Sequence, residues 1–186
     1  MRRFQGVSTR RPVHGLAAAC LLGLSVPVLA EGLPDRGEYR VVYTGLNPAP
    51  AKPLTIGPQR SVTTGIALMT AVNVAGSGFL HNMTGRCTVA PILDGGAKTV
   101  ENQGYCEYLD ADGDRVVERW QVPVQAVGAT VQGTGEWIDG TGKFAGIGGQ
   151  FAFRARRLPA ASEGVAQFVG EKVGSYAITR KTASGD

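Results

Sequence analysis

Two glutamates on neighbouring stretches of the chain are the residues whose types and spacing could do acid–base chemistry. The run NQGYCEYLDADGDRVVERWQV, residues 102–122, has the pattern of a β-hairpin with Asp112-Gly113 at its tip. A two-residue turn at this point predicts that Glu107 lies directly opposite Glu118 across the ladder. Side chains alternate along a strand, so both carboxylates should then lie on the same face of the hairpin.

That face of the hairpin is also its more apolar face, because it carries Tyr105 and Trp120 as well. We therefore expect it to point into a core. Two carboxylates opposed in an apolar interior repel each other and lose hydration, and both effects raise the pKa of at least one of them. A carboxyl group of raised pKa can donate a proton near neutral pH, which makes Glu107 and Glu118 the candidate catalytic pair. The alternative is that this face meets water and the pair is merely tolerated.

Four further side chains could contact a bound molecule: Tyr105, Trp120 and Arg119 in the hairpin, and His81 before it. The sequence contains no recognisable nucleophile–base set. One histidine and two cysteines after the first 30 residues make a poor ligand set for zinc. We therefore predict no metal and no cofactor.

The elements that must position these residues are strands. No helical period of useful length occurs, and Val, Thr, Tyr, Phe and Trp recur in short blocks between turn residues. The blocks predict about eight strands, the first near 38–45 and the last near 174–181, which is the usual count for a small closed barrel. The proline-rich stretch 46–60 is predicted to be an irregular loop.

A glycine-rich stretch, DGTGKFAGIGG at 139–149, lies between two of the predicted strands. A phosphate-binding loop would have Ser or Thr after the lysine and would open a helix, but Lys143 is followed by Phe144. We interpret the stretch as a structural corner in which Phe144 and Ile147 close one end of the barrel. Its glycines Gly140, Gly142, Gly146 and Gly149 would supply backbone conformations with positive φ.

The first 30 residues have the pattern of a signal peptide, with four arginines, an apolar run over 16–29 and small residues before Glu31. We expect cleavage between Ala30 and Glu31, leaving residues 31–186 as one domain in the periplasm or outside a bacterial cell. A twin arginine at Arg10 and Arg11 leaves the export route open between the general and the twin-arginine pathway. The apolar run is too short for a membrane span, so no membrane association is expected after cleavage.

Removal of this leader changes both the charge and the cysteine count of the chain. Four of the 19 basic residues are lost, and the 15 that remain balance the 15 acidic residues. A net charge near zero offers no electrostatic footprint for nucleic acid. Cys87 and Cys106 remain as an even pair in an exported chain, for which a disulfide is the default.

The corner carries a resemblance to a known family. DGTGKFAGIGGQFAF resembles the strand–corner–strand signature of the allene oxide cyclase and dirigent barrel superfamily: Gly140, Thr141, Gly142, Phe144, Gly146 and Gly149 match it, while Asp139 replaces its first glycine. Together with GFLHNMTGRC and GYCEYLDADGD, it is most similar to the small exported bacterial members. The resemblance implies a closed antiparallel β-barrel of about eight strands, with a lumen for an apolar ligand and assembly as a dimer or trimer. No catalytic residue can be carried over from it.

Two functional hypotheses follow. The first is a non-catalytic carrier or scaffold that binds a small apolar molecule in the barrel lumen. The second is a cofactor-free cyclase or isomerase that acts on an apolar or phenolic substrate through the glutamates. A third possibility is a lumen filled by side chains, with any function on the outer surface or in loops such as 46–60.

Overall fold

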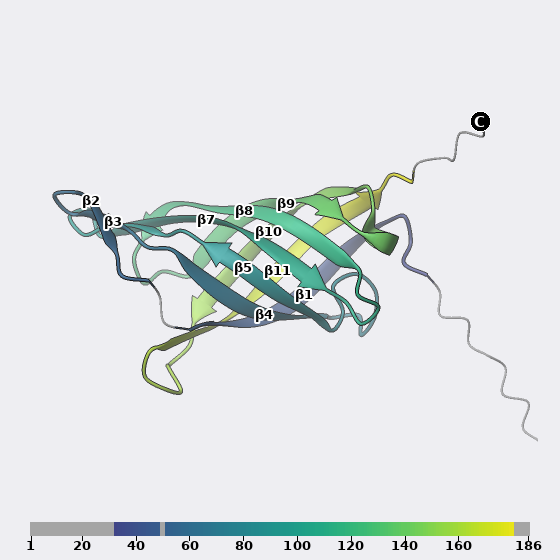
Figure 1. The fold of residues 1–186 in the computed structure, drawn as a ribbon, viewed down its shortest axis with the longest axis horizontal. Coiled ribbons are helices and arrows are strands. Elements are labelled where there is room, and N and C mark those ends of the chain that lie inside the picture. Colours follow the sequence, from purple (N-terminus) through teal and green to yellow (C-terminus); the bar gives the residue numbers. More distant parts are fainter. Residues whose placement is uncertain (1–31, 49–50, 181–186) are drawn as a thin grey trace, which may run out of the picture. The chain divides into compact units, whose positions relative to one another are not determined.

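A computed structural model describes residues 32–48 and 51–180, and this part of the chain consists almost entirely of β-strands (Figure 1). The predicted leader and its cleavage site at Ala30 lie outside the described residues. The elements are β1 (Arg36–Pro48), β2 (Leu54–Gly57), β3 (Arg60–Val62), β4 (Gly65–Asn73), β5 (Met83–Val89), β6 (Ile92–Asp94), β7 (Thr99–Leu109), β8 (Arg115–Ala126), β9 (Val131–Gly140), the short 3₁₀ helix η1 (Gly142–Phe144), β10 (Ile147–Arg157) and β11 (Val165–Ile178).

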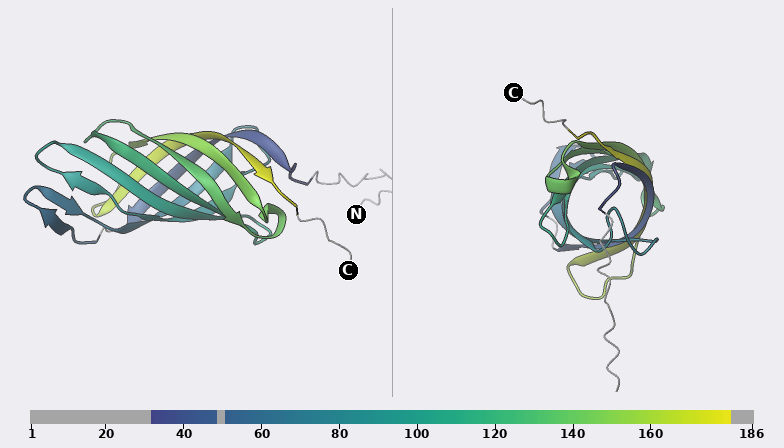
Figure 2. Two further views of the ribbon diagram at one scale, coloured as in Figure 1. Left: turned by 90° about the horizontal axis from the view of Figure 1, so that it is seen from above. Right: turned by 90° about the vertical axis from the view of Figure 1, so that its right-hand side faces the viewer.

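Eight of these strands form a closed antiparallel barrel. Their order around the ring is β7-β5-β4-β1-β11-β10-β9-β8, and pairing of β8 with β7 closes it. The end-on view of Figure 2 shows the strands as a complete ring. The all-β fold class and the barrel predicted from the sequence are therefore confirmed.

The short strands β2, β3 and β6 extend the sheet beyond β7. The prediction of an irregular loop over 46–60 was wrong in this respect, because β1 runs on to Pro48 and two short strands follow. Pro48 ends β1, and Pro58 lies in the turn between β2 and β3. Prolines are tolerated at strand ends because no ladder donor is needed there.

Alternation along each strand separates the interior of the barrel from its surface. In β4, Ala67, Met69 and Ala71 are buried, whereas Leu68 and Thr70, which lie between them, are exposed. A period of two places one set of side chains in the lumen, the space that the barrel encloses. The strands β1, β5, β7, β8, β10 and β11 contribute to the interior in the same way.

The register of the β7–β8 hairpin differs by one residue from the prediction. Tyr108 pairs with Val116, Cys106 pairs with Glu118, and Glu107 therefore lies opposite Val117. A slip of one residue turns every side chain of a strand to the other face. The prediction was right for the inward face of β8 and wrong for that of β7, and the two glutamates do not face each other.

Asp110 causes the shift, because it organises a longer loop than the two-residue turn that was predicted. Its side-chain Oδ1 accepts hydrogen bonds from the backbone N–H groups of Asp112 (2.9 Å) and Asp114 (3.0 Å). The Asp110 N–H in turn donates to the carbonyl of Asp114, and Gly113 adopts φ 88°. Aspartate readily forms such side-chain-to-backbone turns. The strands consequently end at Leu109 and resume at Arg115.

The glycine corner packs against this hairpin loop. The backbone N–H of Lys143 donates to Asp114 Oδ2 at 3.0 Å, and its Nζ lies 2.6 Å from Asp110 Oδ2. Gly142 (φ 52°) and Gly146 (φ 79°) have positive φ, and a Cβ at Gly142 would lie 1.8 Å from Asp114 Oδ1. Glycine is thus required there by both conformation and space.

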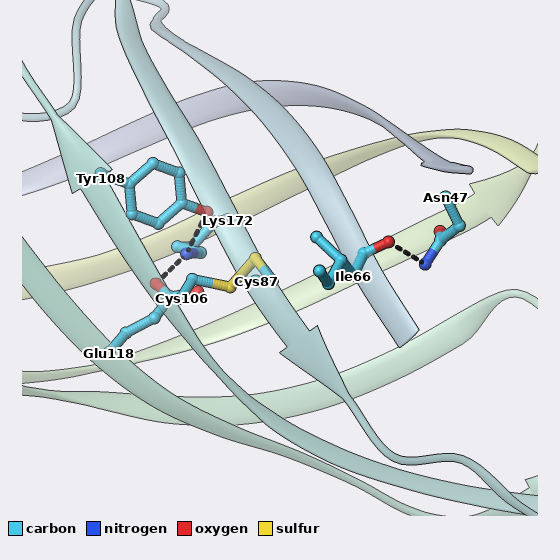
Figure 3. The surroundings of a disulfide bond; sticks show 7 residues. All are labelled: Asn47, Ile66, Cys87, Cys106, Tyr108, Glu118 and Lys172. Carbon is cyan, nitrogen blue, oxygen red and sulfur yellow. Dashed lines mark hydrogen bonds and ion pairs between the residues drawn. A yellow bond between two sulfur atoms is a disulfide. The ribbon is translucent and has the colours of Figure 1, made fainter. Parts of the chain in front are cut away.

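The predicted disulfide is confirmed. Cys87 of β5 and Cys106 of β7 are directly paired across the ladder, with Cα atoms 4.0 Å apart, and both side chains are buried in the lumen (Figure 3). The bond links two adjacent strands halfway along the barrel. It therefore stabilises the part of the wall that carries Glu118 on the neighbouring strand.

Candidate functional site

The most distinctive feature of the interior is an ion pair between Lys172 of β11 and Glu118 of β8. These strands are separated by β9 and β10 around the ring, so the two side chains meet across the lumen. Their side chains are only 4% and 3% exposed. Figure 3 shows the pair beside the disulfide, with Tyr108 on the other side of the lysine. Charged side chains this deeply buried are rare unless they are paired.

Aromatic rings surround the lysine. Its Nζ lies 4.3 Å from the ring centre of Phe151, 5.0 Å from the ring centres of both Trp137 and Tyr108, and 6.0 Å from that of Tyr43. It also lies 3.4 Å from the hydroxyl of Tyr108. The electron-rich faces of these rings compensate part of the hydration that an ammonium group loses on burial. The site is thus one cation, one carboxylate and a wall of rings.

Burial shifts the pKa values of the pair in opposite directions. Burial raises the pKa of Glu118, and the positive charge of Lys172 only partly offsets this. Burial lowers the pKa of Lys172, and Glu118 only partly offsets that. The two pKa values therefore approach each other, which makes proton exchange within the pair easier than in water.

The tyrosines near the pair remain protonated. Burial, and secondarily the charge of Glu118, raises the pKa values of Tyr39, Tyr43 and Tyr108 well above the ordinary value of 10.0. Their hydroxyls can therefore act as hydrogen-bond donors. Tyr39 additionally accepts a hydrogen bond from Trp137 Nε1 at 3.0 Å, which fixes that indole beside the lysine.

One end of the lumen is closed by side chains. We define this closed end by four buried residues: Phe79 from the β4–β5 loop, Phe144 from η1, Ile147 and Tyr176. The ring of Phe79 lies 4.5 Å from that of Tyr176 and 5.8 Å from that of Phe144. These contacts form a plug of the kind expected from the corner.

The opposite end of the lumen is less tightly covered. We call it the accessible end and define it by three half-buried rings, Trp120, Phe153 and Phe168. Trp120 and Phe153 pack edge-to-face at 6.0 Å, and Phe153 lies 6.3 Å from Phe151, next to the ion pair. Aromatic contacts thus continue from the plug, past the pair, to this end.

Glycines on the barrel wall make room for these rings. A Cβ at Gly104 would lie 2.6 Å from the Trp120 ring, and a Cβ at Gly133 would lie 2.5 Å from that of Phe153. The same relation recurs between glycines and rings at four further places: Gly45 with Phe168, Gly85 with Tyr108, Gly135 with Phe151, and Gly170 with Tyr43. The absence of a side chain at each glycine therefore lets an aromatic ring pack directly against the backbone of the barrel wall.

Of the residues predicted for the site, Glu118 and Trp120 face the lumen. Tyr105, Glu107 and Arg119 lie on the outer surface, because β7 has the opposite face inward and Arg119 alternates with its inward neighbours. Tyr105 is 51% exposed, and the side chain of Glu107 is 49% exposed and pairs with Arg115 at 3.4 Å. The expectation that Tyr105 and Glu107 point into the lumen was therefore wrong.

His81 lies in the loop before β5, at the closed end and away from the ion pair. It is half-buried, and its Nδ1 has no hydrogen-bond partner among the described residues. Nothing brings it together with Glu118. The structure thus retains one of the two glutamates of the predicted pair and gives it a lysine as its partner.

Lys172, Tyr108 and Tyr43 were missed by the sequence analysis. The last strand was placed near 174–181, but β11 begins at Val165. Within its run VAQFVGEKVGSYAI, Lys172 has the same parity as Tyr176 and Ile178, which are both buried. That alternation would have placed Lys172 in the lumen, had the strand been extended backwards.

A large hollow lies outside the barrel, on its surface, rather than at the ion pair. A surface groove of about 1210 Å³ runs over the outward side chains of β7 to β11 and β1, and a second of about 540 Å³ adjoins it. Tyr105 and Arg119 line both grooves. Polar, water-exposed side chains such as Gln121 and Glu136 dominate the larger groove, so it lacks the desolvation that strengthens electrostatic interactions at the ion pair.

Among residues 32–48 and 51–180, no three His, Cys, Asp or Glu side chains converge as a metal site would need. In the same part of the chain, no helix is long and apolar enough to cross a membrane.

Comparison with known proteins gives distant structural likenesses. No protein-family model matches the chain, and no curated protein matches it significantly. Among solved structures, the chain is similar to a pterocarpan synthase dirigent protein, with 10% sequence identity, a TM-score of 0.49, and coverage of 81% of this chain and 91% of that chain. A likeness this distant carries no argument about function. The molecule is therefore characterised by its own geometry: a closed eight-stranded antiparallel barrel with a lysine–glutamate pair enclosed by aromatic rings.

Proposed function

We propose that the barrel binds a small, largely apolar molecule with one polar group and acts as a non-catalytic carrier or scaffold. The apolar part of the ligand would lie among Trp120, Phe153 and Phe168 at the accessible end. Its polar group would reach the pair formed by Lys172 and Glu118. The observation that carries the proposal is this ion pair, enclosed by rings in the interior of the barrel.

The pair is a costly way to hold a barrel together. Removing two charges from water costs several kcal/mol for each ion, and apolar residues of similar volume often stabilise a core equally well. The fold therefore does not require charges at Lys172 and Glu118. A polar group of a ligand gives them a use, because the ammonium donates hydrogen bonds and the carboxylate accepts them.

The accessible end offers a further polar contact. Asn102 of β7 lies opposite Val122, and its buried Oδ1 has no hydrogen-bond partner among the described residues. A buried acceptor without a partner is uncommon and costs stability. A hydroxyl or amide of a ligand could satisfy it. Half-buried rings with a few polar groups are typical of sites for small molecules.

The disulfide between Cys87 and Cys106 supports an exported location, because structural disulfides persist in oxidising compartments. An exported carrier would bind its ligand outside the cytoplasm. This agrees with the leader predicted from residues 1–30.

The two tryptophans of the chain provide the test. Trp120 lies at the accessible end and Trp137 lies beside the ion pair, so each indole N–H reports on one part of the proposed site. We expect 1-octanol to shift both indole signals in a ¹⁵N correlation spectrum, saturably and with a single affinity. Variants Trp120→Phe and Trp137→Phe assign the two signals.

A matched pair of variants separates the lumen from the surface. Glu118→Gln should weaken binding of 1-octanol, whereas Glu107→Gln on the outer face of the adjacent strand should not. The proposal is wrong if octanol leaves both indole signals in place, or if the two variants bind it equally well.

A second candidate function is the acid–base isomerase or cyclase, now with Glu118 and Lys172 in place of two glutamates. The observation that favours it is the convergence of their pKa values, which suits a group that gives and takes back a proton. In this case Glu118→Gln would abolish turnover of an apolar epoxide without unfolding the barrel. A variant that retained full turnover would exclude Glu118 as the acid.

A further inference from the structure

The lysine of the ion pair has the environment of an amine that reacts with carbonyl compounds. Lys172 Nζ is enclosed by the rings of Phe151, Trp137 and Tyr108. Desolvation favours the neutral amine, and only the neutral amine is nucleophilic. Because burial lowers the pKa of Lys172, more of this amine is neutral near pH 7 than of a lysine in water.

The neighbouring groups supply what imine formation needs. Glu118 contacts Lys172 Nζ and can accept the proton that the amine releases on attack. The hydroxyl of Tyr108, 3.4 Å from Nζ, stays protonated and can donate a hydrogen bond to a carbonyl oxygen. Once an imine has formed and is protonated, the carboxylate of Glu118 can serve as its counter-ion.

We propose that Lys172 binds an apolar aldehyde covalently, as an imine, in the lumen of the barrel. This inference rests on the proposed function and specifies the ligand class of the same site. The nitrogen of Lys172 forms a bond to the carbonyl carbon, and the two protons of the neutral amine move in turn to the carbonyl oxygen by way of Glu118. Loss of that oxygen as water leaves the C=N bond. Nothing is oxidised or reduced, and hydrolysis releases the aldehyde again.

The chain contains its own control for this reaction. Lys143 at the glycine corner is also paired with carboxylates, but the hydrogen bonds that its ammonium donates to Asp110 and Asp112 raise its pKa. Each unit of difference in pKa changes the neutral fraction of an amine roughly tenfold. Because the pKa of Lys172 is lowered and that of Lys143 is raised, Lys172 should form an imine faster than Lys143 near pH 7.

Reductive trapping tests the proposal. The purified protein is incubated with octanal and sodium cyanoborohydride near pH 7, and the site of the added octyl group is mapped by peptide mass spectrometry. We expect Lys172 to be labelled first and Lys143 last, and an excess of 1-octanol to slow the labelling of Lys172. Labelling that is confined to other amines, or that reaches Lys172 no sooner than Lys143, would overturn the proposal.

A variant of Lys172 extends the test, but the test does not depend on the variant being able to fold. Lys172→Arg should lose the fast label while keeping a cation beside Glu118. If Lys172→Arg does not fold, the mapped site in the unmodified protein decides the question alone. If 1-octanol shifts the indole signals but Lys172 is not labelled, the imine is wrong and the proposed binding function stands. If neither occurs, both are wrong.

Discussion

The free energy of the ion pair can be measured by removing its members singly and together. Lys172→Met leaves the carboxylate of Glu118 buried without a partner, and Glu118→Leu leaves the ammonium of Lys172 in the same position. Both side chains are under 5% exposed, so neither charge can reach water without opening the barrel. Loss of one partner from a buried pair typically costs about 3–5 kcal/mol, whereas replacement of both by apolar residues is neutral or stabilising by about 1–4 kcal/mol.

Urea unfolding, followed by tryptophan fluorescence with the disulfide intact, measures these differences. With a urea m-value of about 2 kcal/mol/M, each single variant should lower the midpoint by about 2 M. The double variant Glu118→Leu/Lys172→Met should return to the midpoint of the unmodified protein or exceed it. Glu107→Gln, on the outer face, should change the free energy of unfolding by no more than about 0.5 kcal/mol.

The single variants should also differ in the sign of their pH dependence. In Lys172→Met, the folded-state pKa of Glu118 lies above its ordinary value of 4.5, so the stability contributed by the protonated carboxyl is lost as pH rises through that pKa. In Glu118→Leu, the folded-state pKa of Lys172 lies below its ordinary value of 10.5, so stability is lost as pH falls through that pKa. Changes in the free energy of unfolding that are small and additive, without opposite pH trends, would show that Lys172 and Glu118 are not a pair buried away from water.

Three further changes test other parts of the structure. Gly170→Ala places a Cβ about 2.3 Å from the Tyr43 ring and should cost roughly 1–3 kcal/mol in urea unfolding, whereas Gly148→Ala, with nothing within 4 Å, should not. Replacing Cys87 and Cys106 by alanine together should lower the free energy of unfolding by about 3 kcal/mol, which the same assay measures; an unchanged midpoint would contradict a structural role. Lys143→Ala should raise the pKa of Asp110, because the carboxyl loses the ammonium that lowers its pKa against the opposing effect of burial. NMR titration measures this pKa, and an unchanged value would contradict the contact between Lys143 and Asp110.

The sequence predicted the fold better than it predicted the site, for physical reasons. Strand alternation, glycine punctuation and the even pair of cysteines are local signals, and they led to the barrel and to the disulfide between Cys87 and Cys106. The corner could also be interpreted locally, because Phe144 and Ile147 are apolar residues between glycines. Such signals need no knowledge of which strands become neighbours around the ring.

The hairpin register depended on a competition that the sequence alone did not resolve. Asp112-Gly113 favours a two-residue turn, but the side chain of Asp110 captures two backbone N–H groups and lengthens the loop. This single difference turned Tyr105 and Glu107 outward and brought Tyr108 inward.

The pairing of Lys172 with Glu118 was not predictable from local pattern, because 54 residues separate them and closure of the barrel brings them together. What the sequence did contain was the alternation of side chains along β11, which places Lys172 on the same inward face as Tyr176. A charged residue on an otherwise apolar and glycine-rich strand face is therefore the signal that would have indicated the site.

The claim that the enclosed charges form a ligand site is tested most directly by calorimetric titration of the protein and its Glu118→Gln variant with 1-octanol. A hydrogen bond to a charged group contributes about 1.5–3 kcal/mol, so we expect the variant to bind roughly 10- to 150-fold more weakly, with the Glu107→Gln control unchanged. Equal dissociation constants for the unmodified protein and Glu118→Gln would contradict the account.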